Sequence, residues 1–483
     1  MRRIGIVDTT LRDAQQCLWA TRMSTAMMLP IAAELDKAGF DVIEVAGAVQ
    51  FDASVRYLGE NPWERLRLLR ERITRAPMQA LLRSKCVMGF DLVPDDLSVL
   101  WAERLIANGI RRFVAFDGLH DLDNLDAAIK RSRELGAYVT GWLTYSLSPV
   151  HTDALYVAKA REFIDRIGVD ALMIEDASGI LTPERAATLV PALKAAIGDV
   201  PLGLHSHGLI GLPQRAYLES VAHGVDHLYT SIAPLADSNA PPSVATTVRN
   251  LRASGYEVDT NDDVVAGISA YLDHLAERTG KPKGEPRDFE ASYLEHQIPG
   301  GVHSNLKAQL EAAGLGHKLP EVLEESARVR ADLGYPIQVT PFAQLIGVQA
   351  TLNVVTGDRY SVVPVEVKKY ALGYYGKLLA PVKPDVLDRI VERGSRTIPL
   401  TPPKLEPIVP QLRKLYPHAD DDEILLRYSF DKGLVDTALS ARPDYDAFAI
   451  ADQPLLHLIR ELSRRQKRAF ITLEKSGVRL AMR

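Results

Sequence analysis

Over its first 290 residues the chain alternates between short apolar runs and longer segments in which apolar residues recur at helical spacing. The apolar runs have strand length and occupy residues 4–7, 42–45, 78–82, 112–116, 137–143, 171–174, 202–204 and 225–229. The helical segments occupy residues 27–38, 62–72, 97–108, 125–135, 154–167, 183–196 and 213–222. Eight strands that alternate with helices over this length predict a (β/α)8 TIM barrel. A doubly wound open sheet is the alternative, although no glycine-rich phosphate-binding turn follows the first strand.

The pattern changes beyond residue 290. Helical spacing returns at residues 319–332, 345–355 and 365–379, and a last helical part begins at Asp421. The prolines between Pro381 and Pro410 are typical of a linker or an extended wrap. We therefore predict three parts: the barrel over residues 1–290, a mainly α-helical domain over residues 291–445, and a basic C-terminal tail over residues 446–483.

Composition and charge narrow the class of protein. The 483 residues are 46% hydrophobic and 25% charged, which is typical of a soluble globular protein, and the formal net charge of -5 argues against a nucleic-acid binder. The tail is the exception, because its basic residues outnumber Glu461 and Glu474. It either docks on an acidic partner or forms a solvated helix face. The basic residues are Arg464, Arg465, Lys467, Arg468, Lys475, Arg479 and Arg483.

The cellular compartment is predicted from the number of cysteines and from the patterns typical of signal peptides and membrane spans. Cys17 and Cys86 are its two cysteines, which is too few for a disulfide framework and fits a reducing cytoplasm. Strand-like sequence begins at Ile4, which leaves no room for a signal peptide. No apolar stretch approaches the roughly 20 residues that span a bilayer. We expect a cytoplasmic protein without a membrane span.

Two stretches point to a divalent-metal site. Asp13 follows the first predicted strand, and His205 and His207 lie at the end of the seventh. Because strand side chains alternate between faces, imidazoles at i and i+2 emerge on the same side and can share one ion. Carboxylate oxygen and imidazole nitrogen suit Zn, Mn, Co or Fe(II). The alternative is that one histidine is a capped polar residue and the other a surface one.

Other chemically useful side chains also follow predicted strands, where barrel active sites lie. Asp117 and Asp176 have an alternative role as helix N-caps. The full set is Arg12, Asp13, Glu44, Arg83, Asp117, Tyr145, Glu175, Asp176, His205 and His207.

Several motifs resemble the carboxyltransferase component of biotin-dependent 2-oxoacid carboxylases and decarboxylases. This family includes pyruvate carboxylase, the oxaloacetate decarboxylase α subunit and the 5S subunit of transcarboxylase. Its fold is a barrel plus a helical domain that completes the active site. The motifs are Asp8-Thr9-Thr10-Leu11-Arg12-Asp13-Ala14-Gln15-Gln16, Ala20-Thr21-Arg22-Met23, Asn61-Pro62-Trp63-Glu64-Arg65, Ser148-Pro149-Val150-His151-Thr152, Leu181-Thr182-Pro183, His296-Gln297-Ile298-Pro299-Gly300-Gly301, Ser304-Asn305-Leu306 and Gln338-Val339-Thr340-Pro341.

The resemblance implies a role for each matching residue. Asp13, His205 and His207 match the family's metal ligands, while Arg12, Gln16 and Arg83 match groups that hold the 2-oxoacid. Thr340 matches the hydroxyl that moves a proton between the substrate methyl group and biotin; its alternative role is an N-cap before Pro341. A metal ion and guanidinium groups would stabilise the developing enolate.

The chain departs from the family pattern after the sixth strand. The family has Lys-Asp-Met-Ala-Gly with a carbamylated lysine, whereas this chain has Glu175-Asp176-Ala177-Ser178-Gly179. Glu175 is the candidate fourth metal ligand, but its side chain is shorter. The ion therefore shifts toward the sixth strand, or a water bridges the gap, or the site is weakened.

The resemblance also implies partners. The chain shows no Ala/Val-Met-Lys-Met motif at its end, so biotin is expected on a separate biotin carboxyl carrier protein, together with a biotin carboxylase subunit. The family is often dimeric, so we expect a homodimer.

Three functions stay open at this point. The first is a carboxyltransferase that moves CO2 between carrier-linked biotin and a small, pyruvate- or oxaloacetate-like 2-oxoacid. The second is a biotin-independent, metal-dependent β-keto acid decarboxylase or aldol-type lyase. The third is an assembly subunit that has lost turnover.

Overall fold

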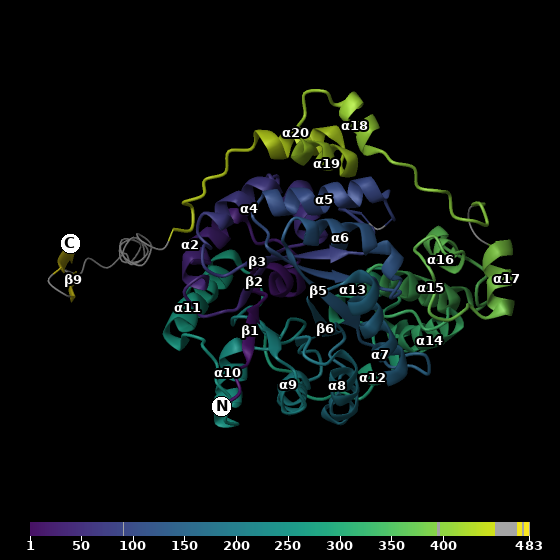
Figure 1. The fold of residues 1–483 in the computed structure, drawn as a ribbon, viewed down its shortest axis with the longest axis horizontal. Helices are drawn as coiled ribbons and strands as arrows, with labels where there is room; N and C mark the ends of the chain where they lie inside the picture. Colours follow the sequence, from purple (N-terminus) through teal and green to yellow (C-terminus); the bar gives the residue numbers. More distant parts are fainter. Residues whose placement is uncertain (90, 394–396, 450–470, 476–477, 483) are drawn as a thin grey trace.

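The centre of the molecule is a closed barrel of eight parallel strands (Figure 1). The computed structural model describes residues 1–89, 91–393, 397–449, 471–475 and 478–482. Consecutive strands are neighbours, and the barrel closes where β8 pairs with β1. The predicted (β/α)8 barrel is confirmed, with strand ends within two residues of those expected. The strands are β1 (Gly5–Asp8), β2 (Val42–Ala46), β3 (Met78–Arg83), β4 (Arg112–Phe116), β5 (Tyr138–Thr144), β6 (Ala171–Asp176), β7 (Leu202–Ser206) and β8 (His227–Thr230).

Helices surround the barrel and bury the outer face of its strands. Because both faces of the sheet are covered, the strands read as nearly continuous apolar runs. The helices are α1 (Gln15–Trp19), α2 (Thr25–Leu35), α3 (Ala48–Ala53), α4 (Pro62–Arg70), α5 (Asp95–Ala107), α6 (Asp126–Glu134), α7 (Asp153–Arg161), α8 (Pro183–Ile197), α9 (Pro213–Ala222), α10 (Val244–Ala253) and α11 (Asp262–Thr279), with short π or 3-10 turns η1 (Thr10–Ala14), η2 (Ser54–Leu58), η3 (Leu122–Asn124) and η4 (Glu162–Ile167).

A second group of helices packs on the carboxyl end of the barrel. Their apolar side chains form one cluster with residues of the barrel interior, among them Phe116 and Trp142. The segment that follows β8 and α11 thus covers the end of the barrel where polar residues leave the strands. The helices are α12 (Tyr293–His296), α13 (Gly300–Ala312), α14 (Leu319–Asp332), α15 (Phe342–Thr356), α16 (Val365–Ala371) and α17 (Pro384–Arg393), with the 3-10 turn η5 (Gly316–Lys318).

One expectation about this region was wrong and a second was right only in part. The helix predicted over residues 365–379 ends at Ala371, because Gly373 and Gly376 turn the chain with φ of 78° and 121°. The proline-rich segment contains α17, which begins at Pro384, whereas residues 397–408 contain neither helix nor strand and so match the predicted linker. Proline at the first turn of a helix costs no hydrogen bond, since that N–H would have no partner within the helix.

The chain then returns to the outside of the barrel. Helices α18 (Val409–Leu415), α19 (Asp421–Ser429) and α20 (Lys432–Ser440) lie beside α4 and α5 (Figure 1). Asp422 fixes this segment, because its carboxylate accepts hydrogen bonds from Arg104 at 2.7 Å, Asn108 at 3.1 Å and Arg67 at 3.2 Å. The indole N–H of Trp63 also donates to the Asp422 carbonyl at 2.9 Å.

Most of the predicted basic tail, including Arg464, Arg465, Lys467, Arg468 and Arg483, lies outside the described residues. The described part is an antiparallel pair, β9 (Ile471–Lys475) and β10 (Val478–Met482). Lys475 and Arg479 therefore lie in strands, and a helix face is wrong for them. Within the described ranges, no helix combines the length and apolar character that crossing a membrane requires.

We predict that Asp422→Ala loosens the segment formed by α18 to α20. The substitution leaves the buried amide of Asn108 and the guanidinium of Arg104 without their acceptor, which typically costs about 1–3 kcal/mol of unfolding free energy. Urea unfolding and hydrogen exchange of residues 409–440 would measure the effect.

The matched control is Asp421→Ala, which removes a surface ion pair with Arg413. Such pairs contribute about 0–1 kcal/mol. Equal losses in the two variants would contradict the role given to Asp422.

Candidate functional site

The candidate site lies at the carboxyl ends of β1 and β7. The turn η1 carries Arg12 and Asp13 directly after β1. This turn forms because the Thr9 carbonyl accepts the N–H groups of Arg12, Asp13 and Ala14. The carboxylate of Asp8 also accepts the Thr10 hydroxyl at 2.6 Å. The local hydrogen bonds thus hold the Asp13 side chain at the mouth of the barrel.

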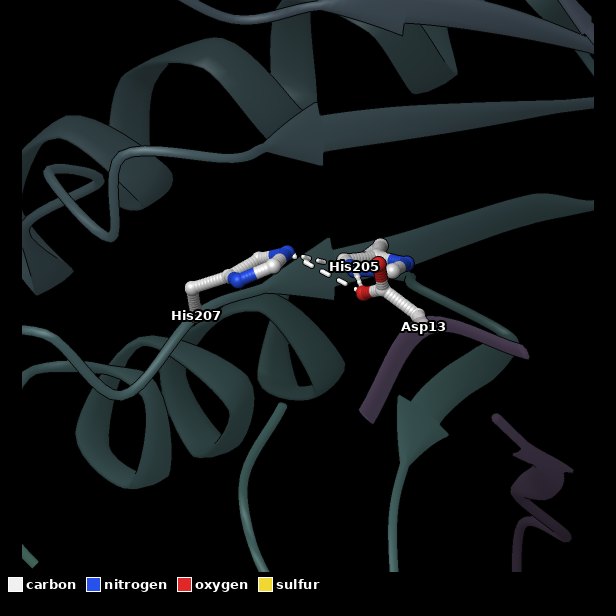
Figure 2. A group of neighbouring side chains, drawn as sticks. All are labelled: Asp13, His205 and His207. Carbon is white, nitrogen blue, oxygen red and sulfur yellow. Dashed lines mark hydrogen bonds and ion pairs between the residues drawn. The ribbon is translucent and has the colours of Figure 1, made fainter. Parts of the chain in front are cut away.

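Asp13, His205 and His207 form a compact cluster of candidate metal ligands (Figure 2). The Oδ2 atom of Asp13 lies 3.0 Å from Nε2 of His205 and 3.2 Å from Nε2 of His207. The two Nε2 atoms lie 3.1 Å apart. All three side chains are buried. The predicted meeting of an acid from β1 with two imidazoles from β7 is therefore present in the fold.

The dimensions of this cluster fit one cation. Three ligand atoms bonded at about 2.1 Å and at right angles lie roughly 3.0 Å apart, and at tetrahedral angles roughly 3.4 Å apart. The observed edges of 3.0, 3.1 and 3.2 Å fall in that interval. Among the described residues, the buried Oδ2 of Asp13 also accepts no hydrogen bond of normal geometry. An acceptor that faces two imidazole nitrogens in this way is suited to a shared cation.

Neighbouring groups orient two of these side chains. The Nδ1 atom of His207 lies 2.6 Å from the Asn239 carbonyl, which can only accept, so Nδ1 donates and Nε2 is the nitrogen that can bind a cation once it has lost its proton. Arg12 donates to Oδ1 of Asp13 at 2.8 Å and to Glu44 at 2.9 Å. Glu44 therefore anchors Arg12 instead of lining the cavity.

The cluster has a definite charge state without metal. Burial lowers the pKa of His205 to about 4, so this imidazole is neutral. Burial opposes charge on His207, but the carboxylate of Asp13 outweighs it and raises the pKa of His207 well above its ordinary value. Burial likewise opposes charge on Asp13, but Arg12 and His207 hold its pKa well below the usual range. A proton on His207 thus stands where a cation would bind, and binding must release it.

A cavity of about 380 Å³ opens over the cluster. Every residue predicted as a catalytic, substrate-binding or metal residue lines it, although they come from η1 and α1 after β1, from β3 and β6, from the end of β7 and from the segment before α15. These residues are Arg12, Asp13, Gln16, Arg83, Glu175, His205, His207 and Thr340. Glu175 faces this cavity but lies outside the three-residue cluster.

Besides Glu44, three more residues singled out by their place after strands do not line the cavity, namely Asp117, Asp176 and Tyr145. Asp117 accepts the N–H groups of Leu119 and Asp121, at 2.8 and 3.0 Å. Asp176 accepts those of Ile180 and Leu181, both at 2.9 Å. Both carboxylates thus accept N–H groups of the loop that follows their strand. The alternative role of helix N-cap is wrong for both, because the N-cap of η3 is Asp121 and that of α8 is Thr182.

Tyr145 stacks on Tyr156 and does not line the cavity. Thr340 makes no capping bond, because Pro341 is the N-cap of α15 and no side chain caps that helix.

Other residues that line the cavity had not been singled out by their position. Trp142 forms a wall and contacts the ring of His205, with centroids 5.7 Å apart. Cys17 lies 3.8 Å from both Asp13 and His207. Gln338 and Gln344 also line the cavity. Both lie close to Thr340 in the sequence, and this proximity could have indicated that they belong to the site.

Comparisons with known proteins agree with this geometry. Residues 294–464 match the family described as a conserved carboxylase domain. The chain is 40% identical over 424 residues to a pyruvate carboxylase subunit of Methanocaldococcus jannaschii, covering 87% of this chain and 74% of that protein. It is 36% identical over 395 residues to the 2-oxoglutarate carboxylase large subunit of Hydrogenobacter thermophilus, covering 82% of this chain and 60% of that protein.

The fold is similar to a solved structure as well. The carboxyl transferase domain of Rhizobium etli pyruvate carboxylase, with oxamate and biotin, superposes with a TM-score of 0.82 at 26% identity. The match covers 92% of this chain and 78% of that chain.

We predict a pH-dependent gain of stability in Glu175→Gln. Burial raises the pKa of Glu175 to about 8, from 4.5 in the unfolded chain. Between these values the unfolded chain is ionised and the folded protein holds the proton, so folding is increasingly penalised as pH rises. The glutamine removes that penalty. The unfolding free energy of the variant minus that of the wild type should therefore be near zero at pH 4.5, grow up to pH 8 and then level off.

Urea unfolding of metal-free protein between pH 4.5 and 9 would measure this difference. Glu71→Gln is the control for the same substitution at the surface, because that side chain is 68% exposed. A flat profile for Glu175→Gln would show that its carboxyl group is ionised in the folded protein throughout.

Proposed function

This chain belongs to the carboxyltransferase family of biotin-dependent carboxylases, and we propose that it moves CO2 between biotin on a separate carrier protein and a small 2-oxoacid. Family membership rests on 40% identity to the pyruvate carboxylase subunit of Methanocaldococcus jannaschii over 87% of this chain and 74% of that protein. The observation that carries the proposal is the single cavity lined by Asp13, His205, His207 and Thr340.

The substrate class follows from the cationic and amide groups of this cavity. Arg12, Arg83 and Gln16 line it, and a guanidinium can hold two carboxylate oxygens at once. The Nη2 atom of Arg12 has no hydrogen-bond partner among the described residues. Gln50 donates to Oε1 of Gln16 at 3.1 Å, which leaves the Gln16 NH2 group for a substrate. These groups suit a pyruvate- or oxaloacetate-like acid, and the similar proteins include carboxylases of pyruvate and of 2-oxoglutarate.

A divalent ion, either Zn, Mn or Co, would be held by Asp13, His205 and His207. When bound, it would supply positive charge near the substrate carbonyl and so favour the enolate. Arg12 holds Asp13 ionised, while Asn239 keeps Nε2 of His207 available. Glu175 is the candidate fourth group, and its place outside the cluster favours contact through a water.

Thr340 would move the proton. A hydroxyl has one donor hydrogen and two acceptor lone pairs, so it can give and take a proton within one geometry. During carboxylation the hydroxyl gives its proton to the biotin nitrogen from which CO2 leaves. It takes a proton from the methyl carbon that then bonds to CO2, so Thr340 ends as it began. Decarboxylation is the same sequence in reverse.

The assembly is also part of the proposal. We expect a biotin carboxyl carrier protein and a biotin carboxylase subunit as partners, and a homodimer of this chain. A biotin-independent lyase, the competing activity, would be insensitive to avidin.

We predict that Asp13→Asn and His205→Gln lose the bound metal, because each removes one of three ligand atoms. Glu175→Gln should keep the metal but bind it about 10- to 100-fold more weakly, as expected for a group that acts on the ion indirectly. Elemental analysis and titration with Zn, Mn and Co would measure this.

His223→Gln is the control for the metal titration, since His223 pairs with Glu219 on a surface helix. Complete loss of metal in Glu175→Gln would make Glu175 a direct ligand. Full metal content in Asp13→Asn would overturn the site.

We predict that Thr340→Ala lowers transfer from carboxylated carrier to the 2-oxoacid by about 10²- to 10⁴-fold, the range for a positioned proton-transfer group. Metal content should be unchanged, and Thr340→Ser should retain most activity because it keeps the hydroxyl. Loss of CO2 from labelled carrier would be followed with and without avidin. Wild-type transfer in Thr340→Ala would remove Thr340 from the mechanism.

A further inference from the structure

The hydroxyl of Thr340 has one protein partner. The Nε2 atom of Gln344 donates a hydrogen bond to Oγ1 of Thr340 at 3.2 Å. In the described part of the chain this is the single hydrogen bond of the Thr340 side chain. Both residues line the cavity above Asp13. The contact therefore lies at the place where the proposed proton transfer occurs.

The start of α15 explains why the partner is Gln344. Pro341 is the N-cap, so Gln344 is the third residue of the helix, one turn beyond Thr340. A side chain at this position can reach back over the helix start. The residues between them, Pro341, Phe342 and Ala343, have apolar side chains. Phe342 is committed to packing, since its ring contacts Tyr370 and Tyr375 at centroid distances of 5.4 and 5.9 Å.

Gln338 is the other nearby amide, but it is engaged elsewhere. Its Nε2 donates to the His296 carbonyl at 3.1 Å. Gln338 is also buried, whereas Gln344 is exposed at the mouth of the cavity. Gln344 is thus the amide that can orient the Thr340 hydroxyl.

The direction of this hydrogen bond has a chemical consequence. An amide NH2 group is a donor only, so it occupies one of the two lone pairs of Oγ1. The O–H hydrogen and the second lone pair then both point away from Gln344. These are the two features that a proton relay needs, one to give a proton and one to receive it. The NH2 group also stabilises negative charge that develops on the oxygen between the two transfers.

We propose that Gln344 is a positioning residue that orients the Thr340 hydroxyl for proton transfer. The inference rests on the proposed function of Thr340 and goes beyond it, because it assigns the orientation of the Thr340 hydroxyl to a second side chain. Gln344 acts through Thr340 and needs no contact with the 2-oxoacid. Its removal should therefore affect turnover and leave substrate affinity unchanged.

The test compares Gln344→Met and Gln344→Glu in the complete carrier-dependent transfer assay. Methionine keeps the length of the side chain and removes the donor, so kcat should fall about 10-fold with KM for pyruvate unchanged. The carboxylate of Gln344→Glu is an acceptor only and draws the hydroxyl hydrogen toward itself. This variant should therefore lose more activity than Gln344→Met, about 100-fold. Gln411→Met, an exposed glutamine on α18, is the control.

A double-mutant cycle with Thr340→Ala separates the possible results. If Gln344 acts through Thr340, Gln344→Met should have no further effect on the residual rate of Thr340→Ala. Equal losses in both backgrounds, a change confined to KM, or a Gln344→Glu variant as active as wild type would each overturn the inference.

Failure of the inference differs from failure of the proposed function. If Thr340→Ala is inactive while Gln344→Met equals wild type, the role of Thr340 stands and that of Gln344 is wrong. If Thr340→Ala retains wild-type transfer, the proposed role of Thr340 fails, and the inference fails with it.

Discussion

An ionised carboxylate cannot be buried without compensating positive charge, and Asp13 sets this requirement for the centre of the molecule. Arg12 satisfies one oxygen at 2.8 Å, and Glu44 in turn fixes Arg12 from β2. The other oxygen faces His205 and His207 and needs either a proton or a metal ion between them. The same constraint therefore ties three strands together and creates the cation site.

The closed barrel is what brings these groups together. Asp13 and His205 are far apart in sequence, but β1 pairs with β8 and β8 pairs with β7. An open sheet that left β1 and β8 unpaired would separate them. The second helical group then supplies Thr340, just before α15, and Gln344, in its first turn, to the lining of the same cavity. The cation site thus comes from the barrel and the Thr340 hydroxyl from the second helical group, and the two meet only in the complete fold.

The strands and the site residues that follow them could be predicted because they depend on local pattern, whereas Gln16 and Thr340 were predicted from the family resemblance alone. Strands buried on both faces are continuously apolar, and barrel chemistry lies where those runs end. Helix α17 was missed because prolines were interpreted as breaks, although Pro384 begins that helix. Long-range partners could not be predicted. Nothing in the sequence connects Asn239 to His207 or Asp422 to Arg104, since those contacts depend on how helices and loops pack. The division of the chain at residues 290 and 445 stays a prediction.

Glu175 shows how one substitution changes the balance of charge in such a site. A carboxylate in direct contact with a cation would be ionised, yet burial raises the pKa of Glu175 to about 8 in the protein without metal. Below about pH 8 the acid therefore holds its proton in the protein without metal. Replacing the proton on His207, which balances Asp13, by a divalent ion adds positive charge and so favours a second negative charge nearby. Metal binding and ionisation of Glu175 are thus expected to be coupled. Through this coupling, the short side chain of Glu175 would supply negative charge to the ion from a distance, whereas a carbamylated lysine would supply it by direct contact.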